Sequence, residues 1–372
     1  MRTAPLALAL LVGTTGTILW ATRFRQPKLQ TMEHLTPVYE VKQLYPSMKG
    51  PEYTNQKLYL EKDTAPELLW IRGYEAVMVG EDGTTPKPQK FMCHNTLSIH
   101  RTLNQHRRLF GCNPYGTRRL FTLSQGQYSV DLPEGCAIPV VSAEKLMLQS
   151  QVLNLNTEDI GEKVRHKVKA HFVRDSELKS PMRPLCIFPS GVSVPTSDPQ
   201  ARPVPKEAME SGCAVDAGGC PIDKDSLGQF RTGHWVVPPG RDERHTAQPN
   251  LFPFDTTIHY IAAHVHPYAE SFELRDLTTN TTVWKADGES LTQGVGLDRI
   301  SHYASPEGIP VFARHRYELV SVYDNKSKED QTAMAFMFFY VHDKFFRKPD
   351  ARALGTSDDS FCGTEKDPAM LR

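Results

Sequence analysis

Short runs in which apolar and polar residues alternate, broken by turn residues, recur along most of this chain. They occupy residues 126–133, 146–156 and 164–173 in the first half and residues 234–237, 257–266, 271–277, 317–323 and 333–341 in the second. Alternation with a period of two, or a short run rich in β-branched residues, is typical of β-strands. Because we find no sustained helical periodicity, the pattern predicts an all-β protein built from antiparallel β-sandwiches.

Proline content divides these strands into two sets. Residues 181–229 are rich in proline, serine and glycine, a composition typical of connections and long surface loops. We therefore expect a first sandwich over residues 35–180 and a second over residues 230–346, both jelly-roll-like and arranged in tandem. A chain of 372 residues is long enough for two such domains. Residues 347–372 are polar and are expected to form a poorly ordered tail.

An apolar segment precedes the first strand-like run. Arg2 lies before it, and Arg23 and Arg25 follow it. Its most apolar part has the length of a signal peptide, the whole stretch almost spans a bilayer, and no clear cleavage site is visible. Residues 1–27 are therefore expected to be a signal peptide or a membrane anchor. The folded region would then be exported, to the periplasm, to the extracellular space or to the membrane surface.

Export changes the interpretation of the seven cysteines, because disulfides persist outside the cytosol. Cys213 and Cys220 flank a glycine-rich turn and are one plausible disulfide pair. Cys112 and Cys136 are a second plausible pair. Sequence alone does not fix the connectivity, and an odd number of cysteines leaves at least one thiol unpaired.

The charge balance limits the classes of partner. The chain has 43 basic and 43 acidic residues, so no bulk electrostatic attraction draws it to nucleic acid. It also contains no phosphate-binding, dinucleotide-binding or serine-hydrolase fingerprint. We therefore expect a small-molecule substrate, no nucleic-acid partner, and contact with a membrane only through residues 1–27.

Two histidines end the strand-like run over residues 257–266. His264 and His266 are two apart, so in a strand their side chains share one face. Two neutral imidazoles on one strand form half of a metal site, and imidazole suits copper, zinc, iron and nickel. The alternative is that both are simply polar residues on a solvated face.

A third ligand can come from the late aromatic run over residues 333–340. This run contains Met334 and Met337, and a thioether beside two imidazoles favours Cu(I), which soft ligands select. The two methionines are three apart and face opposite sides of a strand, so only one can be the ligand without a bulge. The alternative for each is core packing. His234 could lie beside the copper strand as a partner that orients a ligand, or be an ordinary strand-edge histidine.

These two strands resemble the C-terminal catalytic domain of the copper type II, ascorbate-dependent monooxygenases, the family of peptidylglycine α-hydroxylating monooxygenase and dopamine β-monooxygenase. The resemblance implies that His264, His266 and Met334 hold a copper ion that activates dioxygen, with ascorbate as the electron donor. Phe336 and Phe338 follow Met334 at alternate positions. They would favour hydroxylation of an apolar or aromatic substrate.

The first half departs from the family pattern. Family members carry a histidine pair before a Leu-Phe-Gly-Cys stretch, whereas this chain has Cys93-His94 before the corresponding residues 109–112. Leu153 stands where a third histidine would be expected, and leucine cannot bind a metal. A second metal site could still use His94 with Cys93 or His106. The alternative function is a non-catalytic copper-binding or interaction protein with a single retained site.

The remaining histidines show no partner at ligand spacing. We expect them to be solvated: His166, His171, His302, His315 and His342.

Overall fold

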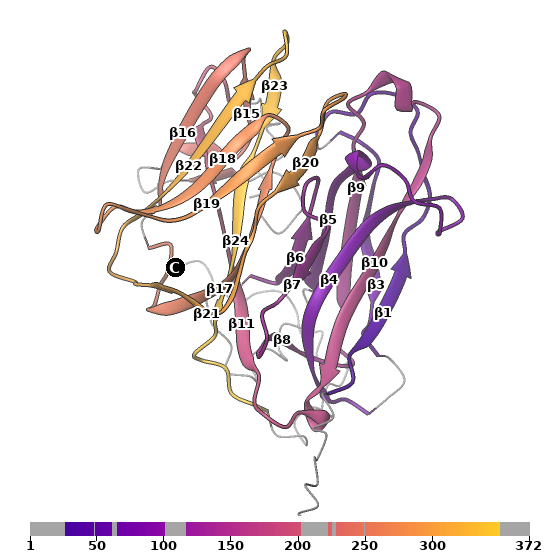
Figure 1. The fold of residues 1–372 in the computed structure, drawn as a ribbon, viewed down its shortest axis with the longest axis vertical. Coiled ribbons are helices and arrows are strands. Elements are labelled where there is room, and N and C mark those ends of the chain that lie inside the picture. Colours follow the sequence, from indigo (N-terminus) through magenta and orange to yellow (C-terminus); the bar gives the residue numbers. More distant parts are fainter. Residues whose placement is uncertain are drawn as a thin grey trace, which may run out of the picture.

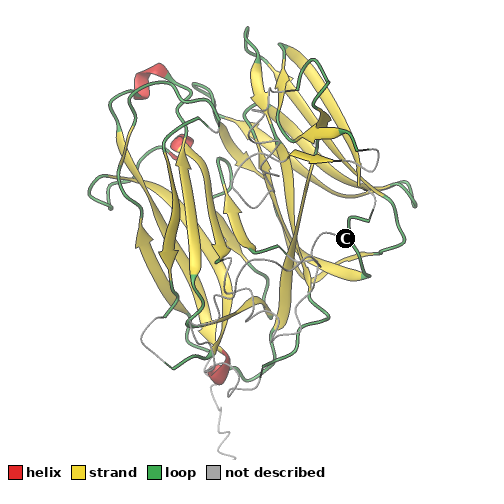
Figure 2. Ribbon diagram, turned by 180° about the vertical axis from the view of Figure 1, so that it is seen from behind, coloured by secondary structure: helices red, strands yellow, loops and turns green. Residues whose placement is uncertain are grey.

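Strands dominate the computed structural model, which describes residues 27–47, 49–61, 65–100, 117–201, 222–224, 228–248 and 250–349. Within these ranges no helix has seven or more residues, which confirms the predicted all-β sandwich fold (Figure 2). The helical elements are three short 3₁₀ turns, η1 (Gln89–Phe91), η3 (Thr157–Asp159) and η4 (Asp175–Glu177). None of the described helices is long and apolar enough to cross a membrane.

The first sandwich packs two sheets around one core (Figure 1). One sheet has the order β1 (Gln30–Leu35), β10 (Lys163–Arg174), β4 (Leu68–Gly80) and β8 (Cys136–Val141), with β2 (Tyr39–Glu40) beside β10 and β7 (Ser129–Asp131) beside β4. The other has the order β3 (Glu52–Leu58), β9 (Leu146–Val152), β5 (Met92–Ile99) and β6 (Arg119–Leu123).

The second sandwich has its own core and its own pair of sheets. One sheet has the order β11 (Arg183–Gly191), β24 (Ala335–His342), β17 (Thr256–Val265) and β21 (Tyr303–Val311). The opposite sheet has the order β16 (Gly240–Gln248), β22 (Tyr317–Asn325), β18 (Ala269–Asp276), β19 (Thr281–Ser290) and β20 (Leu297–Ile300). Two small sheets pair β12 (Val194–Pro195) with β14 (Phe230–Thr232) and β13 (Ile222–Lys224), and β15 (Trp235–Val237) with β23 (Gln331–Ala333).

The segment expected to be a connection, residues 181–229, supplies a core strand instead. β11 pairs with β24 from Leu185 to Gly191, so this part of the prediction is wrong. Proline is tolerated in β11 because β8 pairs only with the first two residues of β11. Beyond them one edge of β11 faces no neighbouring strand in the described sheets, and Pro189 removes no ladder hydrogen bond there.

That short β8–β11 pairing is parallel, in contrast to the antiparallel arrangement expected throughout. It joins the two large sheets edge to edge. Alternate residues of β17 and β24 therefore enter different cores. Tyr260 and Phe338 pack with the first core, whereas Ile261 and Phe339 pack with the second. Burial on both faces explains why the late run of the sequence is apolar almost without interruption.

Polar contacts also hold the two sandwiches together. Gln127 Nε2 donates a hydrogen bond to the Tyr260 hydroxyl at 2.9 Å. The backbone N–H of Leu297 donates to Gln125 Oε1 at 2.9 Å. Both bonds start from the turn after β6 in the first sandwich. They end on β17 and on β20 of the second sandwich, so they hold the two sandwiches together at two points.

Cys136 lies in the first core and is a free thiol. Its plausible disulfide partner is Cys112. Cys112 itself lies outside the described residues, as does the second plausible pair, Cys213 and Cys220. The apolar segment within residues 1–27 and most of the polar tail also lie outside them.

Candidate metal-binding cavity between the sandwiches

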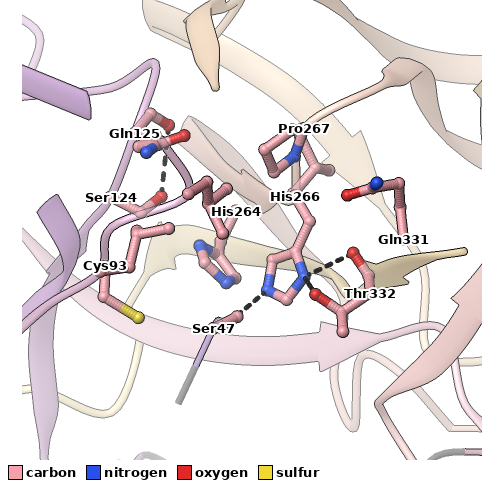
Figure 3. Close-up of a pocket in the computed structure, with 12 residues that line it drawn as sticks. Ser47, Cys93, Ser124, Gln125, His264, His266, Pro267, Gln331 and Thr332 are labelled. Carbon is pink, nitrogen blue, oxygen red and sulfur yellow. Dashed lines mark hydrogen bonds between the residues drawn. The ribbon is translucent and has the colours of Figure 1, made fainter. Parts of the chain in front are cut away.

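A cavity lies where the end of β17 meets β5 and the segment after β9. It has an empty volume of about 420 Å³, including its open mouth. Figure 3 shows His264 and His266 side by side in it, with Cys93 on one side and Thr332 on the other. Both sandwiches therefore contribute walls to the same cavity.

The alternation of β17 sends both imidazoles into this cavity. The ring centroids of His264 and His266 are 5.5 Å apart, and the ring planes are nearly perpendicular at 84°. The ring of His234, just before β15, lies 6.0 Å from the ring of His266 and is buried. Three imidazoles of the second sandwich therefore lie close together at the end of β17.

The hydrogen bonds of His266 define its protonation. Its Nδ1 lies 3.0 Å from the carbonyl oxygen of Thr332, which can only accept, so Nδ1 carries the proton. Nε2 then has a lone pair, to which the Ser47 hydroxyl donates at 3.1 Å. A carbonyl that fixes the tautomer in this way is typical of metal-binding histidines, and it would leave Nε2 as the nitrogen available to a metal ion.

His264 is held neutral by its surroundings. Burial lowers its pKa well below the usual 6.5, and the neighbouring His266, His94 and His234 lower it further. Its Nδ1 is buried without a hydrogen-bond partner. A buried polar atom that makes no hydrogen bond is costly, and metal coordination is one way to satisfy a neutral imidazole nitrogen.

The two candidate methionines lie on opposite sides of the sheet. Val265 pairs with Ala335, which brings the next residue on each strand, His266 and Met334, close together. The Tyr323 hydroxyl bridges them: it accepts from the His266 N–H at 3.2 Å and donates to the Met334 carbonyl at 2.6 Å. Met337 is fully buried in the second core. Met334 is therefore the methionine on the face of His264.

The opposite wall of the cavity comes from the first sandwich and contains Cys93 and Leu153. Cys93 lies at a bulge of β5, and its thiol donates to Gln151 Oε1 at 3.6 Å. Leu153 lines the cavity with it and offers only alkyl surface. His94, the next residue on β5, is buried, and its Nε2 has no hydrogen-bond partner. Burial and the charge of Arg119 lower the pKa of His94 to about 4. His106 lies outside the described residues.

The side chains present fit a soft metal ion better than a hard one. Two imidazoles and no carboxylate line the cavity. Met334 is not one of the lining residues, but it lies on the same face of the sheet as His264, and its thioether together with two imidazoles would match Cu(I). In the described part of the chain no three His, Cys, Asp or Glu side chains are already grouped to hold a metal. A metal ion bound here would therefore need a methionine as third ligand or a movement of the cavity walls toward one another.

One histidine expected to be solvated is fully buried. His166 lies in the first core on β10, where the Asn95 amide donates to its Nδ1 at 3.2 Å. The sequence does carry a signal for this, because Val164, His166 and Val168 alternate on one face of a strand. Ser47 and Thr332, the two partners of His266, were not predicted, since they come from an irregular segment and a short strand without recognisable motifs.

No protein-family model matches the chain, and no curated protein matches it. The resemblance to copper monooxygenases therefore remains a prediction from the sequence.

Proposed function

We propose that this protein binds a single copper ion, as Cu(I), in the cavity between its two sandwiches. His264 and His266 supply imidazole nitrogens, and Met334 supplies a thioether. The observation that carries the proposal is the pair of adjacent, neutral imidazoles in one cavity, one with its ligating nitrogen defined by a backbone carbonyl and the other with a buried nitrogen that lacks a partner.

Each residue has a distinct part in this proposal. The Thr332 carbonyl holds the proton of His266 on Nδ1 and leaves Nε2 for the metal. Tyr323 ties the backbone of His266 to that of Met334, which brings the nitrogen and sulfur ligands to the same place. Copper supplies one-electron redox chemistry when it is bound. Burial of the ligands favours the reduced ion, since a lower charge is less costly to desolvate.

A copper-dependent monooxygenase is the second candidate function. It is supported by the aromatic wall next to the ligands, because Phe336 pairs directly with His264 and could contact an apolar or aromatic substrate. Dioxygen and ascorbate would then be co-substrates. Leu153 and Cys93 favour the simpler binding protein instead, because one copper cannot store both electrons that a hydroxylation consumes. Oxygen uptake coupled to ascorbate oxidation would distinguish the two candidates.

We also propose that the folded region is exported, on the basis of the apolar segment at the N-terminus. A thiol probe that cannot cross membranes tests this in intact cells. Labelling before lysis supports export, whereas labelling only after lysis contradicts it.

Copper analysis of the purified protein tests the proposed function. The wild-type protein should retain about one copper per chain, and His264→Ala should weaken Cu(I) binding about 100-fold or more, because it removes a ligand rather than a partner of one. His171→Ala is the matched control, since His171 is also a strand histidine and bonds to Thr31 at 2.9 Å far from the cavity. Equal copper retention in all three proteins would rule the assignment out.

A further inference from the structure

A buried histidine of the first sandwich is not used by the proposed site. His94 is on β5, next to Cys93, which lines the same cavity as His264 and His266. Along β5 the core-facing positions are Asn95, Leu97 and Ile99, the last two of which belong to the first core. His94 alternates with them and therefore lies on the outer face of that sheet.

This outer face contacts the sheet of the second sandwich that contains β24 and β17. The guanidinium of Arg119, on the neighbouring strand β6, lies 5.5 Å from the ring centre of Phe338 on β24. Phe338 is on the same face of its strand as Phe336, the residue paired with His264. Arg119 influences the pKa of both His94 and His264, and His94 influences that of His264. The charges of the two histidines therefore interact across the interface.

Each of these two histidines has one buried nitrogen that makes no hydrogen bond. The atoms are Nε2 of His94 and Nδ1 of His264. Leaving a buried polar atom without a partner costs about 1–3 kcal/mol. Two such imidazole nitrogens, one from each sandwich, at one interface point to a shared ligand rather than to two separate defects. A metal ion is the ligand that accepts lone pairs from several neutral imidazoles at once.

We propose that His94 is a further ligand of the copper centre, so that the metal joins the first sandwich to the second. This inference rests on the proposed function, since it adds one imidazole to the site of His264 and His266. It differs from a second, separate metal site built on Cys93 and His94. Because no three such side chains are already grouped in the described residues, binding draws the bulge of β5 and the end of β17 together. Copper then stabilises the interface as well as the site.

Cu(I) titration of the full-length protein against a chromophoric chelator tests the proposal. His94→Ala should lower the Cu(I) affinity about 10- to 100-fold and reduce the rise in melting temperature that Cu(I) causes. His264→Ala should lower the affinity further, and His302→Ala, which removes an exposed ring stacked on Tyr260, should change neither quantity.

The two proposals fail in different ways. If His94→Ala binds Cu(I) within twofold of wild type while His264→Ala does not, His94 is not a ligand and the proposed function stands. If neither variant changes the affinity, both proposals are wrong.

A spectroscopic count of imidazoles keeps the test valid if His94→Ala fails to fold. Pulsed electron paramagnetic resonance of the Cu(II)-loaded wild-type protein should detect three coordinated imidazoles, and His94→Gln should show two. Two imidazoles in the wild-type protein would overturn the role of His94.

Discussion

The two walls of the cavity come from equivalent places, the ends of strands in two similar sandwiches, yet they offer different chemistry. The wall from the second sandwich has His264 and His266, and Tyr323 links the backbone of His266 to that of Met334. The wall from the first sandwich has Cys93 and Leu153, with His94 just behind. The difference teaches that two sandwiches of one chain can present walls of different chemistry to a shared cavity, one with imidazoles and one with a thiol and an alkyl side chain.

The largest expected effect comes from giving the first wall the imidazoles it lacks. We expect Cys93→His combined with Leu153→His to raise the copper content from about one to about two per chain, because the two new imidazoles would form a site of their own on the first wall, separate from the centre to which we assign His94. Metal analysis after dialysis is the measurement. Cys93→Ser combined with Leu153→Gln is the control, with similar sizes and no imidazole. A copper content unchanged by the histidines would mean that the first wall cannot form a site.

A second prediction concerns His166, which is buried in the first sandwich. Burial lowers the pKa of His166 from 6.5 to about 3, so the unfolded chain binds its proton at a higher pH than the folded protein. The free energy of unfolding should therefore fall as the pH drops below 6.5, by up to about 1.4 kcal/mol per pH unit, until the folded-state pKa is reached.

Urea unfolding of the metal-free protein at about pH 7.5 and about pH 5 measures this slope. His166→Gln should make the dependence shallower but not remove it, because the pKa of His94 is also lowered, to about 4. An identical slope in wild type and His166→Gln would show that His166 is not kept neutral by the fold.

The second wall depends on close packing next to His264. A Cβ atom at Gly191 would lie 2.5 Å from the ring of Phe336, the residue that pairs with His264. Gly191→Ala should therefore destabilise the protein by about 1–3 kcal/mol, since the ring must move. In the Phe336→Leu variant, which lacks the ring, Gly191→Ala should lower the free energy of unfolding by much less. Chemical denaturation of the four proteins in this cycle gives the coupling energy, and additive effects would contradict the proposed clash.

The smallest effect is expected at the contact between the walls. The Ser47 hydroxyl donates to the nitrogen of His266 that we assign to the metal, so Ser47→Ala should remove a competitor. A hydrogen bond contributes a net free energy of about 0.5–1.5 kcal/mol, so removing the one that competes with the metal should raise the Cu(I) affinity about 2- to 10-fold. Ser124→Ala, which alters another serine of the cavity, should leave the affinity unchanged. Weaker binding by Ser47→Ala would instead make Ser47 a supporting residue.

The sequence predicted the second wall better than the first because its signals are local. Two histidines two apart on an apolar strand must share a face, and two methionines three apart must not, whatever the rest of the fold does. The position of His94 relative to His264 depends on how the two sandwiches pack, which no short pattern encodes. The proline-rich β11 was missed for a similar reason: only its position at a partly open sheet edge explains why proline is tolerated.

X-ray absorption spectroscopy of the Cu(I)-loaded protein tests the central claim most directly, because it identifies the atoms bound to the metal. The account predicts about one copper per chain with nitrogen ligands and one sulfur ligand. The sulfur signal should disappear in Met334→Leu and remain in Met337→Leu, whose side chain lies in the second core. A protein that retains no copper, or a sulfur signal that persists in Met334→Leu, would contradict the proposed centre.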